Sequence, residues 1–227
     1  NTFLINVYQL IFCLPAPIIL ALLINEVHNT KFKRIVQTIT YAPHFLSTVV
    51  LVGMLTTFLS PKVGIVNNLI EALGGERIYF MAEPAWFKHM YVWSGVWQHM
   101  GWNAIIYLAA LTTIGPELHE AAIIDGANKL QRIWHINIPG ILPTAVILLI
   151  LNLGQVMNVG FEKVFLMQND LNMKASDVIS TYVYRTGLLG AQYSFSTAVG
   201  LFNSVINFVL IIIVNTISRK ITEVALW

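Results

Sequence analysis

The chain has 227 residues, of which 56% are hydrophobic and only 11% are charged, with a formal net charge of +2 at pH 7. Its apolar residues come in long runs and not with the short periodicity of soluble helices or strands, so the lipid bilayer is the expected solvent. The scattered basic residues form no surface for nucleic acid, and a single cysteine, Cys13, excludes a disulfide framework and a thiolate metal site.

A helix that crosses a bilayer needs about 20 mainly apolar residues. Five stretches meet this condition, and we expect one span in each of 3–25, 39–59, 90–114, 141–161 and 196–217. Pro15 and Pro17 predict a kink in the first span. The expected fold class is all-α, a polytopic transmembrane helix bundle that forms a single domain over 1–227.

Lys and Arg residues in short connections predict which ends of the spans face the cytoplasm. The connections 26–38 and 115–140 and the C-terminal tail carry such residues, so we assign all three to the cytoplasmic side. This topology places Asn1 outside and predicts at least one further span upstream. With the missing initiator methionine, it leads us to expect that the chain lacks an N-terminal piece.

The polar connection 115–140 is the most distinctive part of the sequence. Pro116 suits the first turn of a short helix, and Glu117 and Glu120 would lie near the positive end of its dipole. Asp125-Gly126 predicts the end of that helix, because glycine readily adopts the left-handed backbone conformation.

A second short helix is expected from about Ala127 to Ile136, after which Pro139 and Pro143 should turn the chain into the next span. The result would be a small cytoplasmic helix pair lying parallel to the membrane. From composition alone, an amphipathic loop that merely connects two spans explains the segment equally well.

Polar residues within two predicted spans mark a second candidate site, because an amide buried in hydrocarbon costs free energy unless it finds a partner. Gln98 and Trp102 are one helical turn apart with His99 beside them, and Asn152 shares a helix face with Gln155. Aromatic rings stack on sugar C–H faces and amides bind hydroxyls, which would suit an oligosaccharide path. Alternatively, the amides join helices and the tryptophans anchor them at the interface.

A family resemblance begins in the same connection. The pattern Glu120-Ala121-Ala122, Asp125-Gly126-Ala127, Ile136, Pro139 and Pro143 resembles the EAA loop of permease subunits in ABC importers. Four further segments resemble polysaccharide-type permeases, which are related to the membrane subunits of maltose transporters and include alginate-type importers: NEVHNTKFKRIVQTITYAPHFLS at 25–47, WSGVWQHMGWNAIIYLAAL at 93–111, NVGFEKVFLM at 158–167 and the tail SRKITEVALW. The resemblance covers essentially the whole chain.

The resemblance implies that 115–140 is a coupling loop that docks on a separate nucleotide-binding subunit. Glu120 would make the charged contact, Ala121 and Ala122 would allow close approach, and Gly126 would make the tight turn. The implied coupling residues are Glu120, Ala121, Ala122, Asp125, Gly126, Ile136 and Pro139. The implied substrate path contains Gln98, His99, Trp102, Asn152 and Gln155.

The implied function is that of a permease subunit in an ATP-driven importer, which moves oligosaccharides across the bacterial plasma (inner) membrane by alternating access. Implied partners are nucleotide-binding ATPase subunits, a second permease subunit in a heterodimer, an extracytoplasmic substrate-binding protein, the oligosaccharide and membrane lipid. The binding protein would dock on the external segments 60–89 and 162–195, which ordinary capped loops explain as well.

We expect no catalytic residue, metal or cofactor in the chain itself. No glycine-rich phosphate loop ending in Gly-Lys-Ser/Thr occurs, so ATP and Mg would bind to the partner ATPase. The alternative is a secondary transporter or a channel for small polar solutes. A secondary transporter would be expected to bury an ionisable coupling group, and the predicted span interiors contain no Asp, Glu, Lys or Arg.

Overall fold

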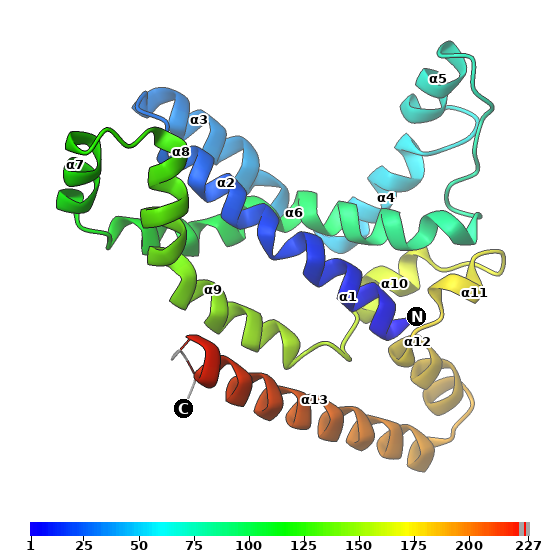
Figure 1. Ribbon diagram of the computed structural model, residues 1–227. Coiled ribbons are helices and arrows are strands. Elements are labelled where there is room, and N and C mark those ends of the chain that lie inside the picture. The colour runs from blue at the N-terminus through cyan, green and yellow to red at the C-terminus, as the bar shows by residue number, and fades with distance from the viewer. Residues whose placement is uncertain (223–224, 226–227) are drawn as a thin grey trace. The chain divides into compact units, whose positions relative to one another are not determined.

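A computed structural model describes residues 1–222 and 225. The described residues form helices joined by turns and contain no strand (Figure 1), so the expected all-α fold is confirmed. Four residues of the tail SRKITEVALW, at 223, 224, 226 and 227, lie outside the described residues.

The described helices and helical turns are connected in the following chain order. They are α1 (Thr2–Cys13), α2 (Pro15–Asn25), α3 (Thr30–Tyr41), the 3-10 turn η1 (Ala42–Phe45), α4 (Thr48–Phe58), α5 (Ile65–Ala72), α6 (Pro84–Thr112), α7 (Pro116–Ile124), α8 (Lys129–Arg132), the π-helical turn η2 (Ile133–Asn137), α9 (Ile138–Leu153), α10 (Phe161–Met167), α11 (Met173–Ser176), α12 (Ile179–Val183), the π-helical turn η3 (Tyr184–Leu189) and α13 (Tyr193–Thr222).

Among the described residues, three helical stretches are long and apolar enough to cross a membrane: Thr2–Asn25, Lys129–Leu153 and Tyr193–Lys220, of 24, 25 and 28 residues. A fourth span is possible if Thr30–Phe45 and Thr48–Phe58, which meet at 101°, are counted as one. These stretches correspond to four of the five predicted spans. The span expected at 141–161 ends earlier, at Leu153, and the one expected at 39–59 is sharply bent after η1.

The remaining predicted span, 90–114, falls within α6, a continuous helix of 29 residues. Its length suffices for a bilayer, but its tryptophan, histidine and amide side chains make it less apolar than the other spans. It remains a predicted span. The predicted kink in the first span coincides with a break at Leu14, between α1 and α2.

The chain divides into two compact units. Unit 1 comprises Asn1–Gln9, Phe45–Val96 and Val156–Val205, and unit 2 comprises Leu10–His44, Trp97–Gln155 and the chain from Ile206 onward. Helices α1, α6 and α13 contribute residues to both.

The core of unit 2 is formed by α2, α6 and α9. Ala21 and Leu22 of α2 pack with Ala104, Tyr107 and Leu111 of α6 and with Ile141 of α9. These three helices thereby hold the connection 115–140 between α6 and α9.

In unit 1, the segment 59–78, in the region predicted to be external, is closed by one buried amide. Asn67 is fully buried, and its Nδ2 donates to the carbonyls of Leu59 (3.0 Å), Ser60 (3.2 Å) and Ile78 (2.9 Å), while its Oδ1 accepts from the Ile78 amide (2.8 Å). The segment is therefore a folded structure and not a loose loop.

An exposed ion pair also stabilises this segment. Arg77 donates to the carbonyls of Pro61 and Lys62 and forms an ion pair of 2.5 Å with Glu71. The hydrogen bond from Arg77 lowers the pKa of the Glu71 carboxyl.

Replacing Asn67 by alanine should loosen this external segment. The change removes the hydrogen-bond partner of three part-buried backbone groups, the Leu59 carbonyl and the Ile78 amide and carbonyl, and each such loss costs about 1–3 kcal/mol where water cannot compensate. Limited proteolysis of the assembled transporter should then cut within 59–78 at least about tenfold faster than in the wild type. The matched control is Asn68→Ala, which removes one exposed hydrogen bond from Arg77 and should have little effect. Equal cleavage of both variants would contradict the locking role of Asn67.

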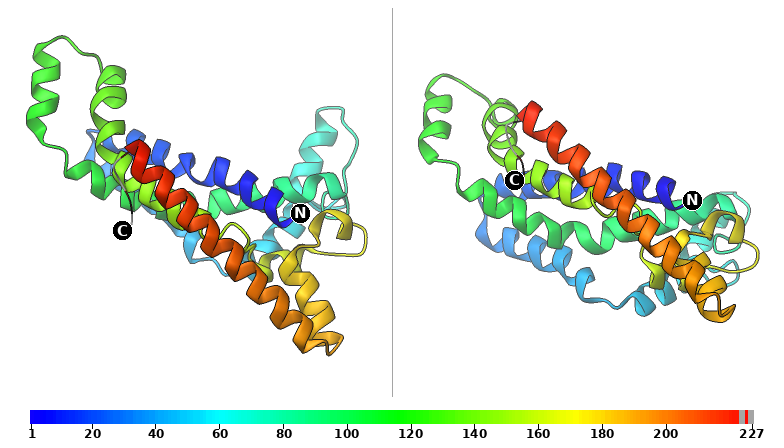
Figure 2. Two further views of the ribbon diagram at one scale, coloured as in Figure 1. Left: turned by 60° about the horizontal axis from the view of Figure 1, so that its bottom comes forward. Right: turned by 90° about the horizontal axis from the view of Figure 1, so that it is seen from below.

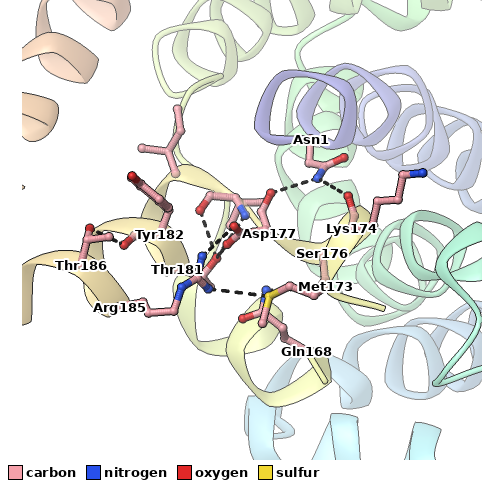
Figure 3. Close-up of polar contacts among 12 residues, drawn as sticks. Asn1, Gln168, Met173, Lys174, Ser176, Asp177, Thr181, Tyr182, Arg185 and Thr186 are labelled. Atoms are coloured by element: carbon pink, nitrogen blue, oxygen red, sulfur yellow. Dashed lines mark hydrogen bonds and ion pairs between the residues drawn. The ribbon is translucent and has the colours of Figure 1, made fainter. Parts of the chain in front are cut away.

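The segment of unit 1 from α10 to η3, also predicted to be external, is tied together by side chains (Figure 3). The Asp177 carboxylate forms an ion pair with Arg185 Nη2 (2.8 Å) and accepts a hydrogen bond from Thr181 Oγ1 (3.1 Å). The Asn1 side chain donates hydrogen bonds to the carbonyls of Lys174 and Asp177, at 3.0 Å each. The hydrogen bond to Asp177 raises the pKa of Arg185. The short helices α11 and α12 are thereby fixed to each other and to the start of the chain.

Candidate functional site

Helix α7 begins where the sequence predicts. Pro116 occupies its first turn after Gly115, and Glu117 is the acidic residue of that turn. Proline lacks the N–H that a helix start leaves unbonded, and a carboxylate there is favoured by the helix dipole.

The end of α7 explains the need for glycine at position 126. The Ala127 amide donates to the Ala122 carbonyl (2.8 Å) and the Gly126 amide to the Ile123 carbonyl (3.0 Å), which together form a Schellman motif. Gly126 has φ +80°, a conformation that L-residues with a side chain adopt only at a cost. The predicted helix stop is therefore present at Gly126.

The expected second short helix is not a separate element. After the turn, Asn128 caps α8: its Oδ1 accepts from the Gln131 amide (2.9 Å) and its own amide donates to Gln131 Oε1 (2.8 Å). From there the helix continues through η2 into α9, so the prediction that Pro139 and Pro143 turn the chain was wrong.

The physical reason for this continuity is a change of hydrogen-bond register before the first proline. The Ile138 amide donates to the Ile133 carbonyl, five residues back, just before Pro139, which has no N–H to donate. A π-helical turn at this point lets the helix absorb a proline that would otherwise break it.

A hollow of about 300 Å³ lies between the end of α7 and the following helix. The two elements stand side by side in both Figure 1 and Figure 2. The hollow is lined by Ala122, Asp125, Gly126, Ala127, Gln131, Arg132, His135 and Ile136. Arg132 Nε is buried and makes no hydrogen bond within the described part of the chain. The hollow thus combines small apolar side chains with an acidic, a basic and an imidazole group.

The outer surface of α7 is unusually apolar for a polar connection. Leu118, Ile123 and Ile124 are exposed, Ile124 at 85% of its surface, and Trp134 of η2 is exposed as well. Apolar residues gathered beside a polar hollow are typical of a surface that another protein covers.

The structure gathers four of the seven predicted coupling residues around the hollow: Ala122, Asp125, Gly126 and Ile136. Glu120 and Ala121 are exposed on α7, one turn before its end, and Pro139 is exposed in the first turn of α9. Sequence reasoning did not identify Arg132 and His135, which face the same hollow. Their spacing of three residues on a helix beside the motif was the available signal.

The predicted substrate residues of α6 form a cluster with a partner that the sequence analysis did not assign. Gln98 is buried, and His99 Nδ1 lies 3.1 Å from Nδ1 of His44 in η1. The His44 ring stacks on Trp102 with centroids 4.4 Å apart and an interplanar angle of 4°. One face of the Trp102 indole is therefore covered by an imidazole, while 41% of the residue remains exposed.

Close packing of α3 on α6 brings His44 to this place. A Cβ on Gly101 would overlap the carbonyl group of Thr40, so only glycine permits the observed approach. The chain then bends through η1, which carries His44.

Asn152 and Gln155 lie at the end of α9 and beyond it. Asn152 Nδ2 donates to the Leu148 carbonyl (2.7 Å) in its own helix. The backbone N–H of Gln155 donates to the backbone carbonyl of Asn152 (3.1 Å). Because α9 ends at Leu153, the predicted shared helix face of these two residues is interrupted.

Residues 7–223 match the family described as "Binding-protein-dependent transport system inner membrane component". Protein LplB of Bacillus subtilis (strain 168) is 44% identical over 227 residues, which is 100% of this chain and 71% of that protein. The polygalacturonan/rhamnogalacturonan transport system permease protein YteP of the same strain is 42% identical over 223 residues, 98% of this chain and 70% of that protein.

A solved structure gives the same result for the fold. The crystal structure of a bacterial alginate ABC transporter in complex with an alginate pentasaccharide-bound periplasmic protein contains a chain with a TM-score of 0.96 at 44% identity. The match covers 100% of this chain and 78% of that one. A structure of a bacterial ABC transporter involved in the import of the acidic polysaccharide alginate gives a TM-score of 0.95 at 44% identity, over 98% of this chain and 78% of that one.

The apolar helical stretches, the glycine-ended loop and these matches define a membrane permease of the ABC transporter class, which is not itself an enzyme. The chain belongs to the family of inner membrane components of binding-protein-dependent transport systems.

Proposed function

We propose that this chain is the permease subunit of an ATP-driven importer that moves oligosaccharides across the bacterial inner membrane by alternating access. The observation that carries this proposal is the match over the full chain, at 44% identity, to a chain of a bacterial alginate ABC transporter. The name of YteP, which refers to polygalacturonan and rhamnogalacturonan, also supports a carbohydrate substrate.

ATP hydrolysis is assigned to a separate ATPase, which binds ATP and Mg, and no catalytic residue, metal or cofactor is proposed in this chain. The ATPase would cover the exposed residues Leu118, Ile123 and Ile124 of α7, and Glu120 would make a charged contact beside them. Burial of these apolar side chains would supply much of the binding free energy.

The geometry of unit 2 provides a route for coupling. The Schellman turn at Gly126 joins α7 to a helical stretch that runs without interruption from Lys129 to Leu153. A force that moves α7 toward the ATPase therefore moves this stretch as one body, together with Asn152 near its far end.

Other partners are proposed for other surfaces. The apolar window of α13 is entirely unburied, which suits lipid or a second permease subunit in a heterodimer. The folded external segments 60–89 and 162–195 would receive the extracytoplasmic substrate-binding protein.

The proposed substrate path can be tested with the complete importer in proteoliposomes. Trp102→Ala, Asn152→Ala and Gln155→Ala should each reduce oligosaccharide uptake about 5- to 30-fold, because each removes stacking or hydrogen bonding worth roughly 1–2 kcal/mol. Basal ATP hydrolysis should be unchanged. The matched control is Asn6→Ala, which also removes an amide that donates to the carbonyl four residues earlier, at Thr2.

Two results would count against the proposal. Wild-type uptake in all three variants would remove these residues from the path. Failure of the chain to co-purify with a nucleotide-binding subunit would revive the secondary transporter or channel.

A further inference from the structure

Asn137 carries a fully buried side-chain amide that has no hydrogen-bond partner. It is the last residue of the π-helical turn η2 in unit 2, and its exposed fraction is 0%. Neither Nδ2 nor Oδ1 of this side chain makes a hydrogen bond to the described part of the chain. A donor or acceptor that leaves water and stays unbonded costs free energy, so the amide makes this arrangement of the chain less stable than an apolar side chain of the same shape would.

The unpaired polar atoms of the molecule are concentrated at this turn. Among the described residues, four buried side-chain nitrogen or oxygen atoms lack a partner, and three of them belong to Asn137 and to Arg132, which directly precedes η2. Asn67 is equally buried, yet both of its polar atoms are hydrogen-bonded. Because buried amides in folded proteins are normally bonded in this way, the exception at η2 points to a functional reason.

The neighbours of Asn137 along the helix belong to an apolar core. Ile141, one helical turn later, is 2% exposed and packs with residues of α2 and α6. Ile133 and Ile138 pack against the same core. Asn137 thus places an amide where this helix otherwise presents isoleucine. A single asparagine in an apolar interface lowers stability and favours the arrangement in which it finds a partner.

Groups that could bond to the amide lie at the end of α6. Gly140, about one helical turn after Asn137, is packed so closely there that a Cβ on it would overlap the Ile114 side chain. Helix α6 ends at Thr112, and the last carbonyls of a helix have no partner within that helix. A small displacement of the helix against the end of α6 would therefore bring the Asn137 amide to acceptors that it does not reach in this arrangement.

We infer that Asn137 is a conformational switch residue. Its unpaired amide disfavours the arrangement described above and favours a second one, in which the stretch Lys129–Leu153 has moved as one body against the end of α6 and the amide is bonded. This inference rests on the proposed function, since alternating access requires two arrangements of the permease. A side chain that is unpaired in one state and bonded in the other changes the relative populations of the two.

The test compares two variants of Asn137 in the complete importer, purified with its nucleotide-binding subunits. Asn137→Leu replaces the amide by an apolar group with the same branching. Asn137→Thr introduces no extra bulk, and its hydroxyl can bond to the helix carbonyl four residues earlier, as those of Thr40 and Thr56 do. Tm is measured without nucleotide and with a non-hydrolysable ATP analogue. Each variant should raise Tm by about 2–5 °C in one condition and lower it in the other, because the amide is unpaired in one state and bonded in the other.

Oligosaccharide uptake by the same two variants in proteoliposomes should fall about tenfold, because the transport cycle must pass through both arrangements and one of them has become too stable. A raised Tm with a reduced uptake distinguishes a switch from packing, since loss of packing lowers both. Ile141→Val, the matched control in the same core, should lower Tm slightly and change uptake per folded complex less than about twofold. Asn67→Thr, at an amide that is already bonded, should lower Tm in both conditions.

Two results would overturn the inference. A Tm change of the same sign in both nucleotide conditions would show that the amide does not change partners, and wild-type uptake in both Asn137 variants would remove the amide from the transport cycle. Failure of the proposed function would look different, because the unaltered importer with its substrate-binding protein would then take up no oligosaccharide. The Tm comparison needs no transport and would still decide whether Asn137 changes partners.

Discussion

Replacing Gly126 by valine in the complete importer is expected to reduce substrate-stimulated ATP hydrolysis and oligosaccharide uptake together, by about 30-fold or more. The φ of +80° places residue 126 in the left-handed region, where an L-residue costs roughly 1–2 kcal/mol and a β-branched residue more. No atom lies within 4 Å of a Cβ built there, so the penalty comes from the backbone of the turn and not from a clash.

A graded series tests this mechanism. Activity should fall in the order Gly, Asn, Ala, Val at position 126, because asparagine tolerates the left-handed conformation better than alanine does. Gly126→Trp should leave the assembled complex detectable and abolish substrate-stimulated transport, because tryptophan also carries the cost of the left-handed backbone conformation. Uptake and ATP hydrolysis are measured on the same proteoliposomes.

Gly74 provides the matched control. It has φ +84° and open space around its Cβ position, but it lies just after α5, in the segment predicted to be external. Gly74→Ala therefore carries the same backbone strain and should leave coupling intact. Equal losses from Gly74→Ala and Gly126→Ala would show that strain lowers stability in general, and normal transport in Gly126→Val would remove the turn from coupling.

The loop around Gly126 shows why some local structure is predictable from sequence. Pro116 at the helix start and Gly126 at its end act through neighbouring backbone groups, and both occur where expected. The course of the chain after Ala127 was mispredicted, because proline normally ends a helix and a register shift at Ile138 instead accommodates it. Such a shift leaves no signal in the pattern of apolar residues.

The candidate path shows the same division between local and distant information. Helical spacing alone groups Gln98, His99 and Trp102 on α6. His44, 55 residues before His99, joins them only because α3 and η1 fold back onto α6. Lys163 lies 72 residues after Tyr91 in the sequence, and only the packing of α10 reveals their contact. Contacts between distant segments thus decide the parts of the site that spacing cannot reach.

Gly101 is the position where a small substitution should most disturb that packing. Gly101→Ala places a Cβ where the carbonyl group of Thr40 now lies, and backbone cannot yield as a flexible side chain can. We expect a loss of about 1–3 kcal/mol of stability, which is the usual cost of overpacking. The measurement is thermal unfolding of the purified complex, where Tm should fall by several degrees.

The same substitution has a functional consequence that distinguishes the site from simple packing. If α3 moves away from α6, His44 in η1 loses its stack on Trp102 and its 3.1 Å contact with His99. Uptake by the folded fraction should then fall to the level of a His44→Ala variant. Gly53→Ala in α4, at a helical glycine with open space around its Cβ position, is the control and should change neither Tm nor uptake. An unchanged Tm in Gly101→Ala would contradict the close approach of α3 and α6, whereas a lowered Tm with normal uptake would confine His44 to a structural role.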